Sequence, residues 1–174
     1  MQKGVVRKRR TSPLSEYGRQ LREKQELKEQ YNLRERQFSQ YIADTLAKGS
    51  TGNAEELFMQ ALEKRLDNVV FRMGMAQTRK QGRQLVAHGH FFVNGRVVDI
   101  PSYRVKRGDV IEIRPQSAAG TLFQNVKLAL KKYQSPSWIQ LDKANMKGEI
   151  MGEPGLEEIA PTVQLPLVFE FYSR

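Results

Sequence analysis

Apolar residues recur at intervals of three and four through the first half of the chain, a pattern that predicts amphipathic helices. Two such stripes are formed by Phe38, Tyr41, Ile42 and Leu46, and by Leu66, Val69, Val70 and Met73. Capping boxes are predicted where Asn32 and Thr78 are followed three residues later by Glu35 and Gln81, and Asn53 is a further candidate cap. Helices are therefore expected to begin near these positions and to end at Gly49, Gly74 and Gly89.

After Gly89 the pattern becomes that of short strands. Asn94-Gly95 lies between two β-favouring runs and predicts a tight hairpin, because both residues tolerate positive φ. The segment 110–113 is expected to add a third strand, and 121–133 a helix that buries Leu122, Val126, Ala129 and Leu130. The proline-containing final third, including the apolar run 165–172, is predicted to be strand and loop. The pattern as a whole predicts an α+β fold: an N-terminal helical domain, then a mixed domain in which a helix-turn-helix precedes a small antiparallel sheet.

The charge of the chain indicates what kind of partner it binds. The formal net charge is +10, and the sequence pI is about 9.9. Residues 1–48 carry twelve basic and six acidic side chains and residues 64–114 eleven and four, whereas residues 149–174 carry one and five. A polyanion such as nucleic acid is therefore the expected partner, facing the first two stretches. A membrane surface is the competing reading, but the sequence has no strongly apolar anchoring run.

Cations cluster on the predicted helix-turn-helix and hairpin. On a helical wheel Arg79, Lys80 and Arg83 lie beside the apolar arc of Leu85 and Val86, so a packed helix would hold them on its surface. Further cations precede this helix or follow the hairpin: Arg72, Arg96, Arg104, Lys106 and Arg107. Guanidinium forks match phosphate oxygens, which indicates RNA binding for the set, while any single member could equally be a solvated surface charge.

Other chemistry is weaker in this sequence. Cysteine is absent, which excludes disulfides, thiolate zinc sites and cysteine nucleophiles. His88 and His90 flank a glycine with no acidic residue close by, so we expect turn or RNA-contact roles and no metal. Trp138 could stack on a base or lie in the core, and Tyr17, in a basic helix, has the same two alternatives.

The segment RLDNVVFRMGMAQTRKQGRQLVAHGHFFVNGRVVDIPSYRVKRGDVIEI resembles, without gaps, the RNA-binding module of the ribosomal protein S-four family. Upstream, LSEYGRQLREKQELKEQYNLRERQF and KGSTGNAEELF resemble the helical domain of the ribosomal member, and downstream SPSWIQLDKANMKGEI and FEFYSR resemble its second half. GEPGLEEIAPTVQLPLV fits the family pattern only loosely. The resemblance implies a flexible basic arm (1–13), a helical domain (14–63) with 166–174 packed on it, and a mixed domain (64–165) whose RNA-binding module spans about 64–114.

The resemblance also implies a function. The protein would be a structural constituent of the small ribosomal subunit that binds the 5′ domain of the rRNA, nucleates assembly and contributes to accuracy near the path by which mRNA enters. It implies a neighbouring ribosomal protein of the S-five family, a cytoplasmic ribosome (bacterial, with an organellar one as the alternative), and neither cofactor, metal, membrane nor homo-oligomer. Relatives usually carry several dozen further N-terminal residues, sometimes with a four-cysteine zinc site; here only the arm stands there. Residues predicted to contact RNA are Lys3, Arg7, Lys8, Arg9, Arg10, Tyr17, Arg19, Arg22, Lys24, Arg65, Arg72, Arg79, Lys80, Arg83, His88, Asn94, Arg96, Ser102, Tyr103, Arg104, Lys106 and Arg107.

Two other functions compete with this interpretation. The first is an RNA-modifying enzyme that carries an S-four-like module, since Arg65-Leu66-Asp67 superficially resembles the catalytic aspartate motif of pseudouridine synthases. Here the motif lies within an apolar-periodic helix, and the flanks are of ribosomal type, which leaves no room for a catalytic domain. The second is a freestanding rescue or stress factor, which stoichiometry on the small subunit would distinguish from a structural component.

Overall fold

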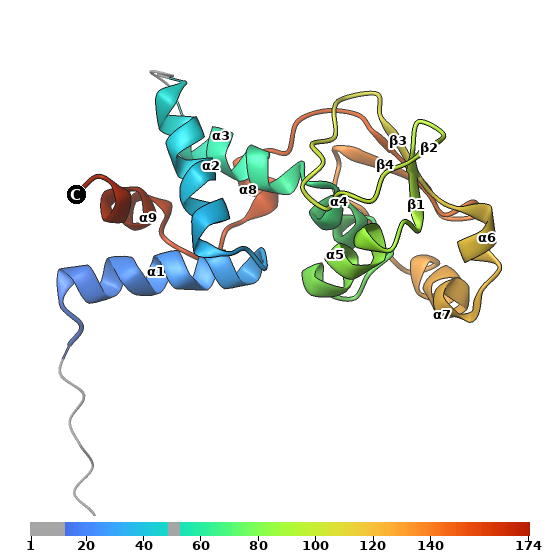
Figure 1. Cartoon of the computed structure of the whole chain (residues 1–174), viewed down its shortest axis with the longest axis horizontal. Coiled ribbons are helices and arrows are strands. Elements are labelled where there is room, and N and C mark those ends of the chain that lie inside the picture. The colour runs from blue at the N-terminus through green and yellow to red at the C-terminus, as the bar shows by residue number, and fades with distance from the viewer. Residues whose placement is uncertain (1–12, 49–52) are drawn as a thin grey trace, which may run out of the picture.

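The computed structural model describes residues 13–48 and 53–174, and Figure 1 shows a helical part beside a mixed part. The predicted arm lies mostly outside the described residues, as do the predicted contacts Lys3, Arg7, Lys8, Arg9 and Arg10 and most of the loop after α2. Within the described residues, the helices and the antiparallel sheet confirm the predicted α+β fold class.

The helical part is built from both ends of the chain. Its elements are α1 (Glu16–Gln30), α2 (Glu35–Ala47), α3 (Ala54–Glu63), α8 (Leu156–Ile159) and α9 (Leu165–Tyr172). Phe38 stands at the centre of its core, with edge-to-face contact to Phe58 at 5.5 Å between ring centroids. Ile159, Val163, Leu165 and Val168 of the last third of the chain are buried in the same cluster. The chain therefore returns to the helical part before residue 166.

The run 165–172 corrects the sequence prediction, because it forms helix α9 and not a strand or loop. Nearly every residue in LPLVFEFY is apolar, so the run has no period by which a helix could be told from a strand. Pro166 is compatible with the first helical turn, where a missing backbone N–H costs nothing. The helix is fixed by packing against α1 and by burial of Leu165 and Val168, three residues apart.

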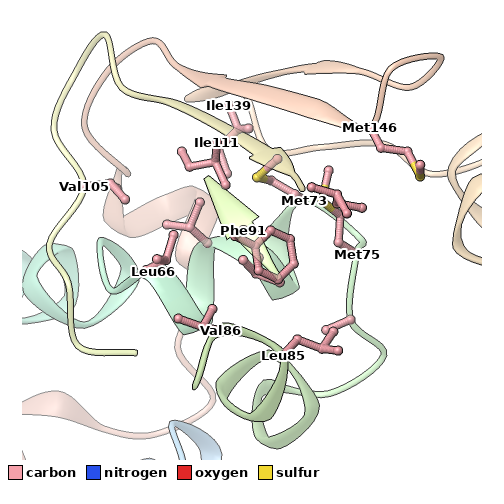
Figure 2. Close-up of a cluster of buried hydrophobic side chains, with 14 of the residues drawn as sticks. Leu66, Met73, Met75, Leu85, Val86, Phe91, Val105, Ile111, Ile139 and Met146 are labelled. Carbon is pink, nitrogen blue, oxygen red and sulfur yellow. The ribbon is translucent and has the colours of Figure 1, made fainter. Parts of the chain in front are cut away.

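The mixed part packs helices on one face of a sheet. Its elements are α4 (Leu66–Arg72), α5 (Arg79–Ala87), β1 (Phe91–Val93), β2 (Arg96–Val97), β3 (Val110–Ile113), α6 (Pro115–Ala118), α7 (Thr121–Leu130), β4 (Ile139–Asp142) and β5 (Lys147–Ile150). The strands are antiparallel in the order β2-β1-β3-β5-β4. Figure 2 shows the core between them, with Phe91 and Ile111 from the sheet facing Leu66 and Val86 from the helices.

The hairpin and the helix-turn-helix follow the predicted turn chemistry. Asn94 and Gly95 have φ values of 51° and 76°, so both adopt the left-handed region that a two-residue hairpin turn requires. Thr78 caps α5 by accepting a hydrogen bond from the Gln81 backbone N–H at 3.1 Å. Gly82 allows α5 to approach α4, since a Cβ there would lie 2.6 Å from the Asp67 carbonyl oxygen.

Two local predictions were wrong. Asn32 does not cap α2: it adopts a φ of 52° and ends α1, its N–H donating to the Glu29 carbonyl while that of Leu33 donates to Lys28. In α7 the buried face is formed by Phe123 and Leu130, whereas Leu122 is half exposed. Of the predicted face, Leu130 is buried and Val126 is partly buried against the core, because the apolar pattern alone does not specify which of its members make the contact.

Trp138 is buried in the mixed core, at 4% exposure, which decides between its two alternatives. It is therefore not a base-stacking residue.

We predict that Leu165→Ala destabilises the protein by about 2–5 kcal/mol, because it leaves a cavity in the helical core. Leu128→Ala on α7, where the side chain is 63% exposed, is the matched control and should change stability by less than about 0.5 kcal/mol. Urea unfolding followed by circular dichroism measures both. Equal effects of the two substitutions would contradict the role given to the C-terminal segment.

Candidate nucleic-acid interface

A buried carboxylate joins the two parts of the molecule. Glu63, the last residue of α3, is fully buried. Its oxygens accept hydrogen bonds from the Tyr31 hydroxyl at the end of α1 and from the Asn68 amide on α4, at 2.8 Å for the latter. Arg72 donates to both oxygens at 2.8 Å, in fork geometry. We call Tyr31, Glu63, Asn68, Arg72 and Arg79 the Glu63 cluster.

Protonation of this cluster is set by its charges. Burial opposes ionisation of Glu63, but hydrogen bonds and charge from Arg72, with the Tyr31 hydroxyl, hold the pKa of Glu63 below its ordinary value. Burial, followed by the charge of Glu63, raises the pKa of Tyr31. The ionised carboxylate, the charged guanidinium and the neutral phenol therefore stabilise one another.

Two arginines attach α5 to the helical part. The Nε of Arg79 donates to the Asn68 side-chain oxygen at 2.7 Å, and its guanidinium lies between the rings of Tyr31 and Phe71, at 4.5 and 4.6 Å from their centroids. Arg83 donates to the Asn32 carbonyl at 2.9 Å, at the turn between α1 and α2. Both were predicted to face RNA, as was Arg72. Their guanidinium groups contact protein partners and are partly exposed, so all three have a structural role, and the RNA contacts predicted there stay predictions.

A second buried ion pair lies beside the first. Arg65, 2% exposed, donates from Nε and Nη2 to both oxygens of Asp67, at 3.0 and 2.7 Å, and from Nη1 to the Tyr41 hydroxyl of α2 at 3.0 Å. We call Tyr41, Arg65 and Asp67 the Arg65 cluster. The charge of Arg65 is paired with Asp67 inside the protein, so Arg65 has a structural role, and the RNA contact predicted there stays a prediction. Burial opposes its charged form, but the hydrogen bonds and charge of Asp67 raise the pKa of Arg65.

Lys24 is also withdrawn from the surface. Its Nζ donates to Glu35 at 2.8 Å and lies 4.6 Å from the centroid of the Phe171 ring. The Tyr172 hydroxyl donates to the same Glu35 oxygen at 2.6 Å. Lys24 thus ties α1 to α2 and α9, and the RNA contact predicted there stays a prediction. The charge pattern of α1 alone does not reveal this role of Lys24, because Phe171 and Tyr172 come from the C-terminal segment.

A groove crosses the boundary between the two parts. It has a volume of about 410 Å³ and lies between α2 and the segment before β3, where Tyr41 and Arg65 of the Arg65 cluster are part of its lining. Its lining residues are Arg36, Gln37, Gln40, Tyr41, Asp44, Arg65, Ser102 and Arg104. The backbones of Arg65 and Arg104 pair as an isolated antiparallel bridge, which holds the two walls together. The groove presents cations and neutral hydrogen-bonding groups, with Asp44 as one carboxylate.

Exposed cations lie on both parts, and two of them, Arg36 and Arg104, line this groove. Of the predicted contacts, those with exposed side chains are Arg19, Arg22, Lys80, Arg96, Arg104, Lys106 and Arg107. Sequence reasoning missed Arg34 and Arg36, which are exposed at the start of α2. The signal for them was the charge of the YNLRER segment, whereas the placement of Arg36 and Arg104 in one groove arises from the tertiary structure. The RNA-binding roles of the exposed residues stay predictions.

Several predicted contacts have a structural role. The side-chain oxygen of Asn94 accepts from the Val110 N–H and its amide donates to Asp109, both at 2.9 Å, so this side chain ties the hairpin turn to the start of β3. Tyr103 packs against the mixed core, and its carbonyl accepts from the Leu66 N–H at 2.8 Å. Ser102 beside it is exposed in the groove.

The two histidines differ. His90 contacts the Ser117 hydroxyl at 2.8 Å through Nδ1, and burial, with the charges of His88 and Arg114, lowers the pKa of His90. His88 is exposed. Over residues 13–48 and 53–174, no three His, Asp or Glu side chains are arranged to hold a metal ion.

Tyr17 is half exposed on α1. Its ring lies 5.7 Å from that of Phe171 on α9, between centroids, and the Arg174 guanidinium lies 5.9 Å from its centroid. One face of Tyr17 is therefore used within the protein, while its RNA contact stays a prediction.

The aspartate that suggested an enzyme has no access to substrate. Asp67 is 4% exposed, and both of its oxygens accept hydrogen bonds from Arg65. Its Oδ1 also accepts from the Asn68 backbone N–H at 2.8 Å. A carboxylate so paired cannot act as a nucleophile or base. No helix among the described residues has the length and apolar character needed to cross a membrane.

The fold and the cationic surface define a class: a non-enzymatic RNA-binding protein with a helical part and a helix-turn-helix and hairpin module. Comparison with known proteins agrees. Residues 1–63 match the ribosomal protein S4/S9 N-terminal domain family, and residues 64–111 match the S4 domain family.

Curated relatives cover nearly the whole chain. The small ribosomal subunit protein uS4 of Persephonella marina is 46% identical over 173 residues, which span 99% of this chain and 83% of the relative. The uS4 protein of Chloroflexus aurantiacus is 45% identical over 99% of this chain and 83% of its own. That of Anaeromyxobacter sp. is 47% identical over 92% and 76%. The chain belongs to the ribosomal protein uS4 family, a family of structural, non-enzymatic proteins.

We predict that Asp67→Asn destabilises the protein by about 3 kcal/mol, because it leaves the buried Arg65 charge without its anionic partner. Asp99→Asn makes the same chemical change at an exposed residue. It should alter stability by less than about 0.5 kcal/mol. Unfolding in urea compares the two variants, and a neutral Asp67→Asn would contradict the buried ion pair.

Acid should weaken the contact of α9 with α1 and α2. Burial opposes ionisation of Glu35, but hydrogen bonds from Lys24, Tyr172 and Lys28 lower its pKa from 4.5 to about 2. The folded-state pKa is thus below the unfolded one, so the stabilisation is present above about pH 4.5 and is lost as the pH falls toward 2.

The stabilisation should amount to about 1 kcal/mol, after allowance for solvent screening of a half-exposed side chain. Unfolding free energies of the native protein and Glu35→Gln, measured from pH 6 to pH 2.5, should converge as the pH falls. A constant difference over that range would contradict the assignment.

Proposed function

We propose that this protein is a structural constituent of the small ribosomal subunit, which binds the 5′ domain of the rRNA and nucleates subunit assembly. The observation that carries the proposal is the groove at the boundary of the two parts, flanked on both walls by exposed arginines. The helical part supplies Arg36, with Arg34 exposed two residues before it, and the mixed part supplies Arg104. Both parts would therefore contact one junction of several RNA helices at the same time.

Recognition would proceed mainly through phosphate, 2′-hydroxyl and shape. The major groove of A-form RNA is deep and narrow, which hides the base edges from side chains. Exposed Arg and Lys neutralise phosphates and release condensed counterions. Ser102 and Gln40 in the groove can exchange hydrogen bonds with ribose hydroxyls. We propose no cofactor and no metal for this binding.

We further propose a place for the protein within the subunit. It would lie near the path by which mRNA enters, contact a neighbouring protein of the S-five family and contribute to translational accuracy. The cations Arg7, Lys8, Arg9 and Arg10, outside the described residues, would face mRNA. It would act as one copy per subunit in a cytoplasmic ribosome, not as a homo-oligomer. Support comes from the uS4 relatives and from the two-domain division that the family matches suggest, at residue 63.

We predict that replacing Lys80, Arg104 and Arg107 with alanine makes the salt dependence of rRNA binding shallower. The slope of log K against log salt concentration should fall by about 2, since each phosphate contact contributes about 0.7–0.9. The measurement is filter binding of a 5′-domain rRNA transcript to the full chain at several salt concentrations.

The control replaces Lys127, Lys131 and Lys132, which are exposed on and just after α7, with alanine. This triple variant removes the same formal charge from another face, so its slope should stay near that of the native protein. Equal changes in slope for both variants would reduce the effect to net charge and reject the proposed interface.

A further inference from the structure

The joint between the two parts is polar, although each part has an apolar core. The buried hydrophobic cluster of the helical part and that of the mixed part share no member among the described residues. Between them lie the Glu63 cluster and the Arg65 cluster, each an arginine–carboxylate pair completed by a tyrosine hydroxyl from the helical part. In both clusters the arginine belongs to the mixed part, and the tyrosine follows α1 or lies on α2.

Such a joint specifies an orientation more narrowly than apolar packing does. Apolar burial is non-directional and tolerates sliding of one surface over another. Glu63 instead accepts from Tyr31, Asn68 and twice from Arg72, so its acceptor sites point to fixed donors on α1 and α4. A rotation of one part would leave a buried charge without a partner, which is strongly unfavourable.

The joint also sets the position of the proposed RNA-binding cations. Arg79 and Arg83 attach α5 to the α1–α2 turn, and Lys80 between them is exposed. A shift of α5 relative to α1 therefore moves Lys80 relative to Arg19 and Arg22. The arginines of α5 that the sequence pattern favours as RNA contacts thus act on the geometry of their neighbours.

We propose that Glu63, acting through Tyr31 and Arg79, is a positioning residue for RNA binding: it holds the two parts in the orientation in which both contact one folded RNA. The inference rests on the proposed function. A fixed orientation lets the second part bind as an intramolecular event at high effective concentration. A protein with a loose joint would occupy the competent arrangement for a fraction of the time, and its apparent affinity would fall by that fraction.

The test measures orientation and affinity on the same full-length chain. The sequence contains no cysteine, so spin labels can be attached at two introduced cysteines and nowhere else. We choose the exposed positions Glu29→Cys on α1 and Gln124→Cys on α7. Pulsed electron–electron double resonance then gives the distribution of distances between the two spin labels, one on each part. Filter binding gives the affinity for a 5′-domain rRNA transcript.

We expect a narrow distance distribution in the labelled parent. Glu63→Gln and Arg79→Gln should broaden it and weaken rRNA binding about tenfold, as when about a tenth of the molecules are competent. Saturating rRNA should narrow the distribution again. Tyr31→Phe, which removes one hydroxyl, should have the same effects to a smaller extent, and it decides the question if circular dichroism shows that the other variants do not fold.

Lys80→Ala is the matched control from the same helix. It should weaken binding and lower the salt slope while leaving the distance distribution narrow. A distribution that stays narrow in the folded joint variants, or one that broadens with no loss of affinity, would overturn the positioning role. If the parent itself fails to bind the transcript, the proposed function fails instead, so the two failures are distinguishable.

Discussion

The structure depends on one buried carboxylate that is saturated with donors. Glu63 ends α3, and its oxygens are bound by groups from α1 and α4, with the Arg79 guanidinium of α5 3.7 Å away. A carboxylate in that position would be costly without partners, and with them it imposes a geometry on every element that supplies one. The helical part and the mixed part are therefore joined at this point by directional hydrogen bonds, on which the proposed spacing of their RNA-binding surfaces depends.

This constraint divides the basic residues into two groups. Some arginines are used inside the protein, where the forked donors of Arg65 and of Arg72 each bind both oxygens of a carboxylate. Other cations, such as Lys80, Lys106 and Arg107, stand at the surface. The net charge of +10 therefore indicates attraction to RNA. It does not identify which side chains make contact with the RNA.

The C-terminal segment completes the hydrophobic core of the helical part. Leu165 and Val168 of α9 fill the core that α1, α2 and α3 leave open, and Tyr172 joins Lys24 on Glu35. Figure 1 shows α9 beside α1, so the first and last described helices of the chain are neighbours. The helical surface that carries Arg19 and Arg22 is thereby assembled from residues more than a hundred positions apart.

The sequence by itself determined the elements whose signals are local: the Thr78 cap, the Asn94-Gly95 turn, and the stripe of Leu66, Val69, Val70 and Met73. It also determined the fold class and, through charge, the kind of partner. Only the tertiary structure decided that 165–172 is a helix, that Arg65 and Lys24 are buried, and that Arg36 and Arg104 line one groove. The physical reason is that local hydrogen bonding and periodicity are written in adjacent residues, whereas the burial of a charge depends on partners brought from distant segments.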